Sequence, residues 1–135
     1  MQDRPDAREL LATLGDFLEY ELLPDLDGPL KYRTRVAANL ARILERELRL
    51  GNGFLLRERD RLCRLLGVGS EDLMPGSLHD QVEDLNQQLV SELQQDALLA
   101  GFEAEAWNVL MAVTRDKLAI VRPGYDDYDA AGEAR

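Results

Sequence analysis

The chain has one cysteine and one histidine among its 135 residues, and aromatic residues make up only 6% of it. A lone cysteine, Cys63, excludes an intrachain disulfide and a cysteine-based zinc site. A lone histidine, His79, excludes the paired Glu-x-x-His ligands of di-iron helical bundles. The longest apolar runs, such as residues 97–100, fall far short of the ~20 residues that cross a bilayer. We therefore predict no metal site, no cofactor and no membrane association.

Catalytic motifs are also missing from the sequence. There is no glycine-rich phosphate loop and no Gly-x-Ser-x-Gly nucleophile elbow. No catalytic residue is predicted, which favours a non-enzymatic protein without deciding the question. The N-terminal residues are polar and lack the basic and apolar regions of a signal peptide, so we expect a cytoplasmic location.

Charge is unevenly distributed along the chain, whose formal net charge is −10. Residues 1–30 carry −6, residues 31–64 carry +6, residues 65–114 carry −9 and residues 115–135 carry −1. An acidic protein repels nucleic acid and anionic membranes at long range, so neither is an expected partner. A basic middle between acidic flanks instead predicts pairing within one chain or between chains.

Apolar residues recur at helical spacing in five segments. The predicted helices cover residues 4–23, 29–50, 53–66, 78–94 and 102–122. The first follows Asp3, and Ser77 with Asp80 predicts a capping box for the fourth. The stops are predicted at residues that end helices, namely Pro24, Gly51, Gly67 and Pro123, with a further break near Gln95, Asp96 or Gly101.

No segment shows the two-residue alternation of a strand. The sequence therefore predicts an all-α chain, an up-down bundle of about five helices joined by short connections. Its length suits a single domain, which we place at residues 1–124. Residues 125–135 are acidic and rich in small residues, and are expected to be a mobile tail.

Two side-chain clusters are candidate sites. His79 lies beside three acids, Asp80, Glu83 and Asp84; they can share a cation or, as is more common, favour the helix N-terminus and face solvent. On the second predicted helix Arg35, Asn39, Arg42 and Arg46 form a polar stripe that suits a phosphate or carboxylate. The structural alternative for the stripe is pairing with an acidic helix, with Asn39 partly buried and hydrogen-bonded.

Two apolar candidates have ordinary structural explanations. Cys63 stands among Leu62, Leu65 and Leu66, so it is expected to be a small buried hydrophobe. Trp107 is expected in the core or at an interface.

Several runs together resemble a bacterial family of small helical domains of unknown function. They are residues 17–24, 35–39, 43–48, 117–120 and 123–125. Members of that family are often encoded beside aminoglycoside-phosphotransferase-like kinases and acyl-CoA dehydrogenases. The resemblance extends over about residues 2–125 and implies association with such an enzyme, but it assigns no catalytic residue. The residues it marks for testing are Arg35, Asn39, Glu45, Glu47 and Lys117.

The sequence thus predicts a non-catalytic interaction or accessory protein. Its partner is expected to be a second copy of itself, a kinase-like protein or an acyl-CoA-metabolising enzyme. The alternative is a small-molecule module that holds an acyl or phosphorylated ligand between helices. The candidate polar network comprises Arg35, Asn39, Arg42, Glu45, Glu47 and Lys117.

Overall fold

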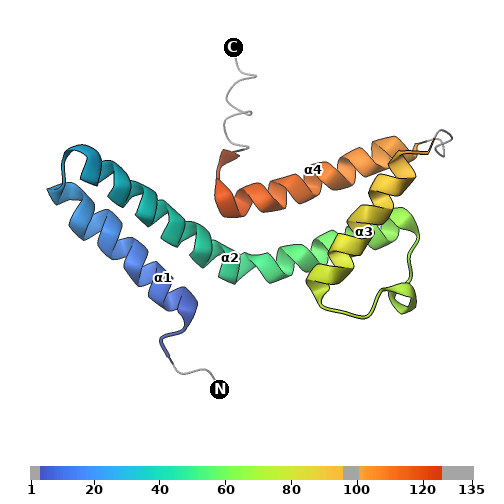
Figure 1. Cartoon of the computed structure of the whole chain (residues 1–135), viewed down its shortest axis with the longest axis horizontal. Coiled ribbons are helices and arrows are strands. Elements are labelled where there is room, and N and C mark those ends of the chain that lie inside the picture. Colours follow the sequence, from blue (N-terminus) through green and yellow to red (C-terminus); the bar gives the residue numbers. More distant parts are fainter. Residues whose placement is uncertain (1–3, 96–100, 126–135) are drawn as a thin grey trace, which may run out of the picture. The chain divides into compact units, whose positions relative to one another are not determined.

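Helices account for the regular structure throughout residues 4–95 and 101–125, the part of the chain that the computed structural model describes. The four α-helices are α1 (Ala7–Asp16), α2 (Gly28–Leu66), α3 (Leu78–Leu93) and α4 (Phe102–Val121) (Figure 1). Between α1 and α2 lie a π-helical segment, η1 (Phe17–Leu22), and a 3-10 turn, η2 (Leu23–Asp25); a second 3-10 turn, η3 (Ser70–Asp72), precedes α3. The all-helical prediction is confirmed.

The predicted number of five helices is wrong, because the second and third segments form one helix. α2 runs for 39 residues without a stop at Gly51 or a restart at Gly53. Neither glycine has a positive φ, so both adopt ordinary helical geometry. A glycine inside a helix costs about 1 kcal/mol relative to alanine, an amount that packing of the flanking turns offsets. The apolar pattern on both sides of the Gly-Asn-Gly sequence outweighs the local penalty.

The start of α1 also differs from the prediction. Asp6, rather than Asp3, caps the helix: its carboxylate accepts the backbone N–H of Glu9 at 2.8 Å, and the Glu9 carboxylate accepts the N–H of Asp6 at 2.9 Å. This reciprocal pair satisfies two N–H groups that a helix start leaves without partners. Pro24 does not mark the helix end either, because α1 gives way to η1 after Asp16 and Pro24 lies within η2.

The remaining helix boundaries follow their capping residues. α2 ends where Gly67, at φ 68°, lets Val68 donate its N–H back to the Cys63 carbonyl at 3.0 Å. Ser77 and Asp80 form the predicted capping box of α3, and α4 ends before Pro123. The predicted break between α3 and α4 is confirmed: α3 ends at Leu93 and α4 begins at Phe102. Residues 96–100, between them, lie outside the described part. Residues 126–135 of the predicted tail also lie outside it. The 1–124 domain boundary and the up-down bundle stay predictions.

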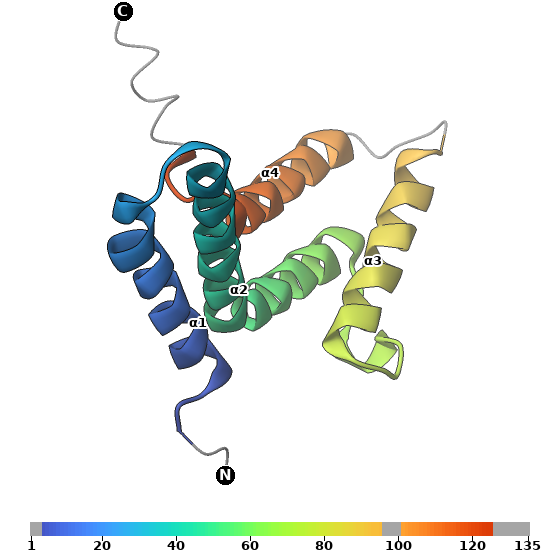
Figure 2. The same cartoon turned by 60° about the vertical axis from the view of Figure 1, so that its left-hand side comes forward.

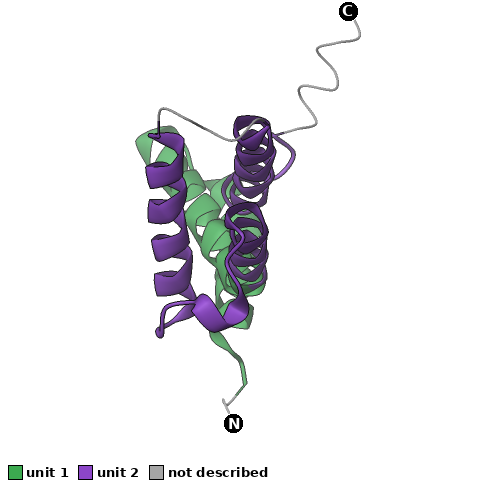
Figure 3. Cartoon of the chain, turned by 90° about the vertical axis from the view of Figure 1, so that its right-hand side faces the viewer, with its two compact units in different colours: residues 1–52 green, residues 53–135 purple. Residues whose placement is uncertain are grey.

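The chain divides into two compact units, residues 1–52 and 53–135 (Figure 3). In the first unit, α1 runs alongside the first half of α2 (Figures 1 and 2). Among its described residues, the buried ones are all small: Gly15, Thr34, Ala38 and Ala41. At Gly15 an added Cβ would stand 3.0 Å from the Arg42 guanidinium, so the Arg42 side chain of α2 lies against α1 there.

The second unit contains the larger core. Leu62 of α2, Val82, Leu85 and Leu89 of α3, and Ala106 of α4 are its buried cluster. Leu85 is fully buried and Leu62 is 1% exposed. Cys63 packs half-buried against this cluster, and burial raises the pKa of its thiol, as fits a structural rather than a reactive cysteine. Trp107 is 65% exposed, so it does not belong to the core.

The continuity of α2 predicts a stabilising substitution. Gly53→Ala is expected to raise the free energy of unfolding by about 0.5–1 kcal/mol, because alanine loses less backbone entropy in a helix and nothing lies within 4 Å of its Cβ. Urea unfolding followed by circular dichroism measures the change. Gly67→Ala is the control and is expected to destabilise, since φ at Gly67 is +68°. A destabilised Gly53→Ala protein would mean that the helix is interrupted at this point.

Candidate functional site

A buried carboxylate lies where three helices of the second unit meet. Glu58 of α2 is only 5% exposed. It accepts a hydrogen bond from Asn86 Nδ2 of α3 at 3.2 Å and one from Lys117 Nζ of α4 at 3.4 Å. Asn86 also donates to the Val82 carbonyl at 2.9 Å, which fixes the amide in place. Charge neutralisation by Lys117 and the hydrogen bond from Asn86 are what permit a carboxylate in this position.

On α4, the residue immediately before Lys117 is a second carboxylate, Asp116, which holds two arginines of α2. Arg61 Nη1 donates to Asp116 Oδ2 at 2.7 Å, and Arg57 Nη2 donates to Asp116 Oδ1 at 3.2 Å. The Arg57 guanidinium also lies over the Phe54 ring, 4.5 Å from its centroid. Two cations around one carboxylate leave this cluster with a net positive charge.

Two opposed effects act on the pKa of the Asp116 carboxyl. Burial acts to raise the pKa of the carboxyl, but the hydrogen bonds from Arg61 and Arg57 outweigh it, and the pKa is lowered. A group with a lowered folded-state pKa stabilises the fold above its unfolded pKa of about 3.9, and that contribution is lost as the pH falls through the folded pKa.

A pH-dependent prediction follows for Asp116→Asn. At pH 6 the variant is expected to be less stable than the wild type by about 1 kcal/mol, because its amide pairs weakly with two arginines. Below about pH 4 the difference is expected to shrink, since the carboxyl becomes protonated first in the unfolded wild-type chain and, at lower pH, in the folded one. Urea unfolding at pH 6 and pH 3 measures both values. Asp60→Asn, which alters a side chain 57% exposed and paired with Arg59, is the control for general charge effects. A difference that stays constant with pH would contradict the assignment.

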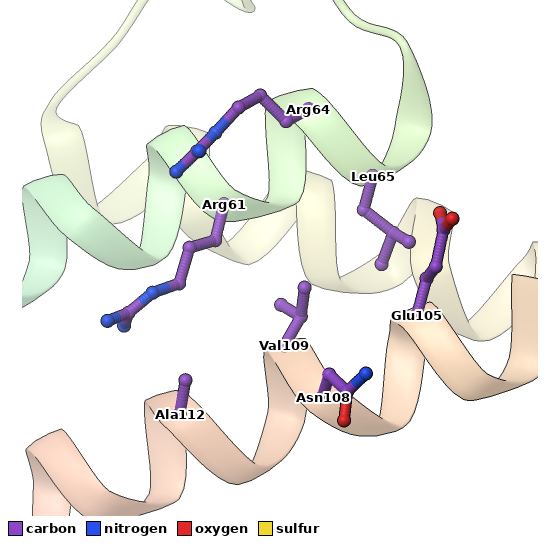
Figure 4. A pocket seen from close by; sticks show the side chains of 7 residues that line it. All are labelled: Arg61, Arg64, Leu65, Glu105, Asn108, Val109 and Ala112. Atoms are coloured by element: carbon purple, nitrogen blue, oxygen red, sulfur yellow. The ribbon is translucent and has the colours of Figure 1, made fainter.

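An open groove of about 420 Å³ lies beside the Asp116 cluster, between the second half of α2 and α4 (Figure 4). Leu65 points toward α4, and Val109 and Ala112 point toward α2 (Figure 4). Arg61 occupies one end, and Glu105 stands at the other beside Leu65 (Figure 4). Arg64 and Asn108 complete the lining. Pockets of this size accommodate small organic molecules.

The acidic cluster beside His79 includes a residue of a helix-capping box. Residues 4–95 and 101–125 contain no group of three or more His, Cys, Asp or Glu side chains placed to hold a metal ion. Asp80 of the predicted acidic cluster is the N3 residue of the α3 capping box, and the hydrogen bonds that its carboxylate accepts from Ser77 lower its pKa. The acids next to His79 therefore include one with a defined structural role.

The predicted polar stripe separates into residues with different surroundings. Arg42 pairs with Asp16 at 2.6 Å and Glu19 at 2.9 Å, hydrogen bonds that raise its pKa above the ordinary value. The structural alternative thus applies to Arg42. Arg35 and Asn39 are exposed and have no hydrogen bond or ion pair with any described residue, so the expected burial of Asn39 is wrong.

The other predicted residues make separate contacts. Glu45 accepts from Arg49, one turn along the same helix, at 3.1 Å. Glu47 is exposed, and its carboxylate lies beside Gly51. Lys117 belongs to the second unit and pairs with Glu58. The five predicted residues of the first unit do not form one network with each other, and Lys117 has its partner within the second unit.

Sequence reasoning missed Glu58, Asn86, Asp116 and the arginines that hold it. A signal was present for Glu58, because it falls in the helical register of Leu55, Leu62 and Leu66, where an apolar residue is expected. No comparable signal marks Asp116, since its arginines lie 55 and 59 residues away in the sequence.

Comparison with protein families matches residues 24–125 to a domain of unknown function, DUF6285. The chain belongs to this family. The DUF6285 match covers α2, α3 and α4, and therefore both the Glu58 and the Asp116 clusters. Residues 17–23, which include η1, precede it. Neither a curated protein nor a solved structure matches the chain. In the described part of this DUF6285 protein, no helix is both long and apolar enough to span a membrane.

Proposed function

We propose that this DUF6285 protein is a non-catalytic accessory protein that docks on a helical partner through the exposed apolar row of its first unit. The row comprises Val36, Leu40, Leu44 and Leu48 of α2. The observation that carries the proposal is the contrast in this unit between its buried and its exposed residues. Its described buried residues are small, whereas Leu40, Leu44 and Leu48 are 54%, 52% and 57% exposed.

The exposed apolar row has the geometry of a helix-packing surface. Residues spaced by four lie along one ridge of a helix, and such ridges fit the grooves of a second helix. Leu10 and Leu14 of α1 and Phe17 of η1 are also about half exposed, at 55%, 48% and 46%. Neighbouring exposed apolar side chains along one helix face commonly mark a site of protein interaction.

Charge favours an acidic partner. The part of α2 that carries the row also holds six basic residues and two acidic ones: Lys31, Arg33, Arg35, Arg42, Arg46, Arg49, Glu45 and Glu47. Arg35 and Asn39 lie exposed there and supply polar groups at the edge of a docking surface. A second copy of the chain offers the acidic segment 65–114 as a partner for this basic part of α2. An enzyme with an acidic helical face offers a comparable partner.

The resemblance noted above supplies candidate partners in a bacterial cytoplasm. These are an aminoglycoside-phosphotransferase-like kinase and an acyl-CoA dehydrogenase. The charge distribution supplies a second copy of the chain as a further candidate. The alternative, a small-molecule site at Arg35, Asn39 and Lys117, receives less support. The first two are exposed in the first unit and Lys117 is held by Glu58 in the second.

A docking experiment tests the proposal with matched variants. The purified chain is sedimented at low and high salt, alone and with each enzyme encoded beside its gene. We expect association that Leu40→Gln with Leu44→Gln abolishes, while the unfolding free energy changes by no more than about 0.5 kcal/mol per site. Val90→Gln with Leu93→Gln, exposed apolar residues of α3, is the control. A monomer in every condition, or equal loss in the control, would refute the proposal.

A further inference from the structure

We propose that the groove between the second half of α2 and α4 binds a small aliphatic carboxylate. The carboxylate group pairs with Arg61, and the aliphatic chain lies along Leu65, Val109 and Ala112. This site is separate from the docking row of the first unit, and it stands or falls independently of the proposed function.

The cationic end of the groove is pre-organised. The Arg61 side chain is 24% exposed and is held by Asp116 through Nη1 at 2.7 Å. A guanidinium carries five N–H donors in a fixed fork, so a group held at one nitrogen can still receive a carboxylate at another edge. Because Arg57 shares the same Asp116, the cluster already has one cation more than it has anions. An incoming carboxylate balances that charge.

The middle of the groove is apolar and supported by the core. Leu65 and Val109 pack against the buried cluster of the second unit. The surface they offer to a ligand is therefore backed by fixed side chains, which lowers the entropy lost on binding. Ala112, the smallest residue of the lining, stands on α4 one turn before Asp116.

The far end of the groove limits what the ligand can carry there. Glu105 is exposed and stands beside Leu65 (Figure 4). A second negative charge on the ligand would be repelled at this end, whereas a methyl terminus, a hydroxyl or an ammonium is compatible with it. The lining thus selects a monoanion over a dianion with a charge at each end.

The probes are butanoate, hexanoate and octanoate, titrated into the full chain and followed by amide chemical shifts. We expect shifts that cluster at the groove residues, with a Kd on the order of 1 mM for hexanoate, as suits a ligand of this size. Hexanol, which keeps the chain but not the charge, and adipate, which carries a charge at both ends, are expected to bind at least about tenfold more weakly.

Two variants remove different parts of the site. Arg61→Gln takes away the cation, and Ala112→Phe fills the groove without changing any charge. Both are expected to weaken hexanoate binding at least about tenfold, while Arg59→Gln, on the same helix and paired with Asp60, leaves it unchanged. Circular dichroism and urea unfolding verify that each variant is folded.

Several results would overturn the inference. They are no saturable shift with any of the three carboxylates, equal binding of hexanol and hexanoate, or an Arg59→Gln effect as large as that of Arg61→Gln. Retained binding in a folded Ala112→Phe protein would also overturn it, because the proposed position of the chain would then be filled.

Discussion

Replacing Leu85 with alanine is expected to lower the free energy of unfolding by about 3 kcal/mol. Leu85 is fully buried at the centre of the cluster formed with Leu62, Val82, Leu89 and Ala106. The loss combines the transfer free energy of the removed carbons with the cost of the cavity left behind, because residues on α2 and α4 cannot move inward freely. Small proteins are stable by only about 5–15 kcal/mol, so this change removes a large part of the total.

Fluorescence of Trp107 reports on this unit, since it is the only tryptophan and belongs to α4. We expect the urea midpoint of its transition to fall in the Leu85→Ala protein. Val90→Ala is the matched control on the same helix: Val90 is 53% exposed, so its truncation is expected to change stability by less than about 0.5 kcal/mol. A Leu85→Ala effect below about 1 kcal/mol would show that the cluster is not the core of the unit.

The second large effect is expected from Asn86→Leu, which removes a hydrogen-bond donor from Glu58. We expect a loss of about 2 kcal/mol, because the carboxylate stays buried and keeps only Lys117 as a partner. The Lys117 side chain is 65% exposed, so water competes with its contact to Glu58 and limits the compensation it provides.

A double variant separates lost hydrogen bonding from lost packing. In Glu58→Leu with Asn86→Leu both partners are apolar and no polar group is left buried, so stability is expected to recover to within about 1 kcal/mol of the wild type. Lys117 then returns to solvent. Gln87→Leu, at an exposed position of the same helix, is the control. An Asn86→Leu protein as stable as the wild type would show that Glu58 does not depend on the amide.

These expectations rest on contacts that the sequence indicates only in part. The capping box at Ser77 and Asp80 can be read directly, because both partners lie three residues apart and their bonds are local. Asp6 and Glu9 have the same spacing and form the capping box of α1. The sequence nevertheless predicts a start after Asp3, because proline is common in the first turn of a helix and Pro5 suits that place. Local signals of this kind compete, and hydrogen bonds decide between them.

The Gly51–Gly53 stretch shows where local signals mislead. Two glycines around an asparagine are typical of a helix end, but α2 passes through them in helical geometry. Propensity differences of about 1 kcal/mol are small beside the packing free energy of the turns on either side. The number of helices was therefore predicted wrongly although each apolar segment was recognised.

The candidate site shows a further limit. Spacing singles out Arg35, Asn39 and Arg42 because periodicity reveals which residues share a helix face, whereas Glu45 and Glu47 are singled out by the family resemblance. Periodicity does not reveal which charged side chain has a partner on another helix. Glu58 and Asp116 acquire their roles from residues 28 to 59 positions away, at distances that only the folded chain defines.

The sequence by itself determined the helical class, the caps at Ser77 and Gly67 and the basic character of residues 31–64, because each depends on neighbouring residues or on composition. Tertiary structure alone decided that Glu58 is buried, that two arginines share Asp116, and that Leu40 and Leu44 face outward. Burial and charge pairing depend on which helix faces lie together, and that choice minimises the free energy of the whole chain rather than of any one segment.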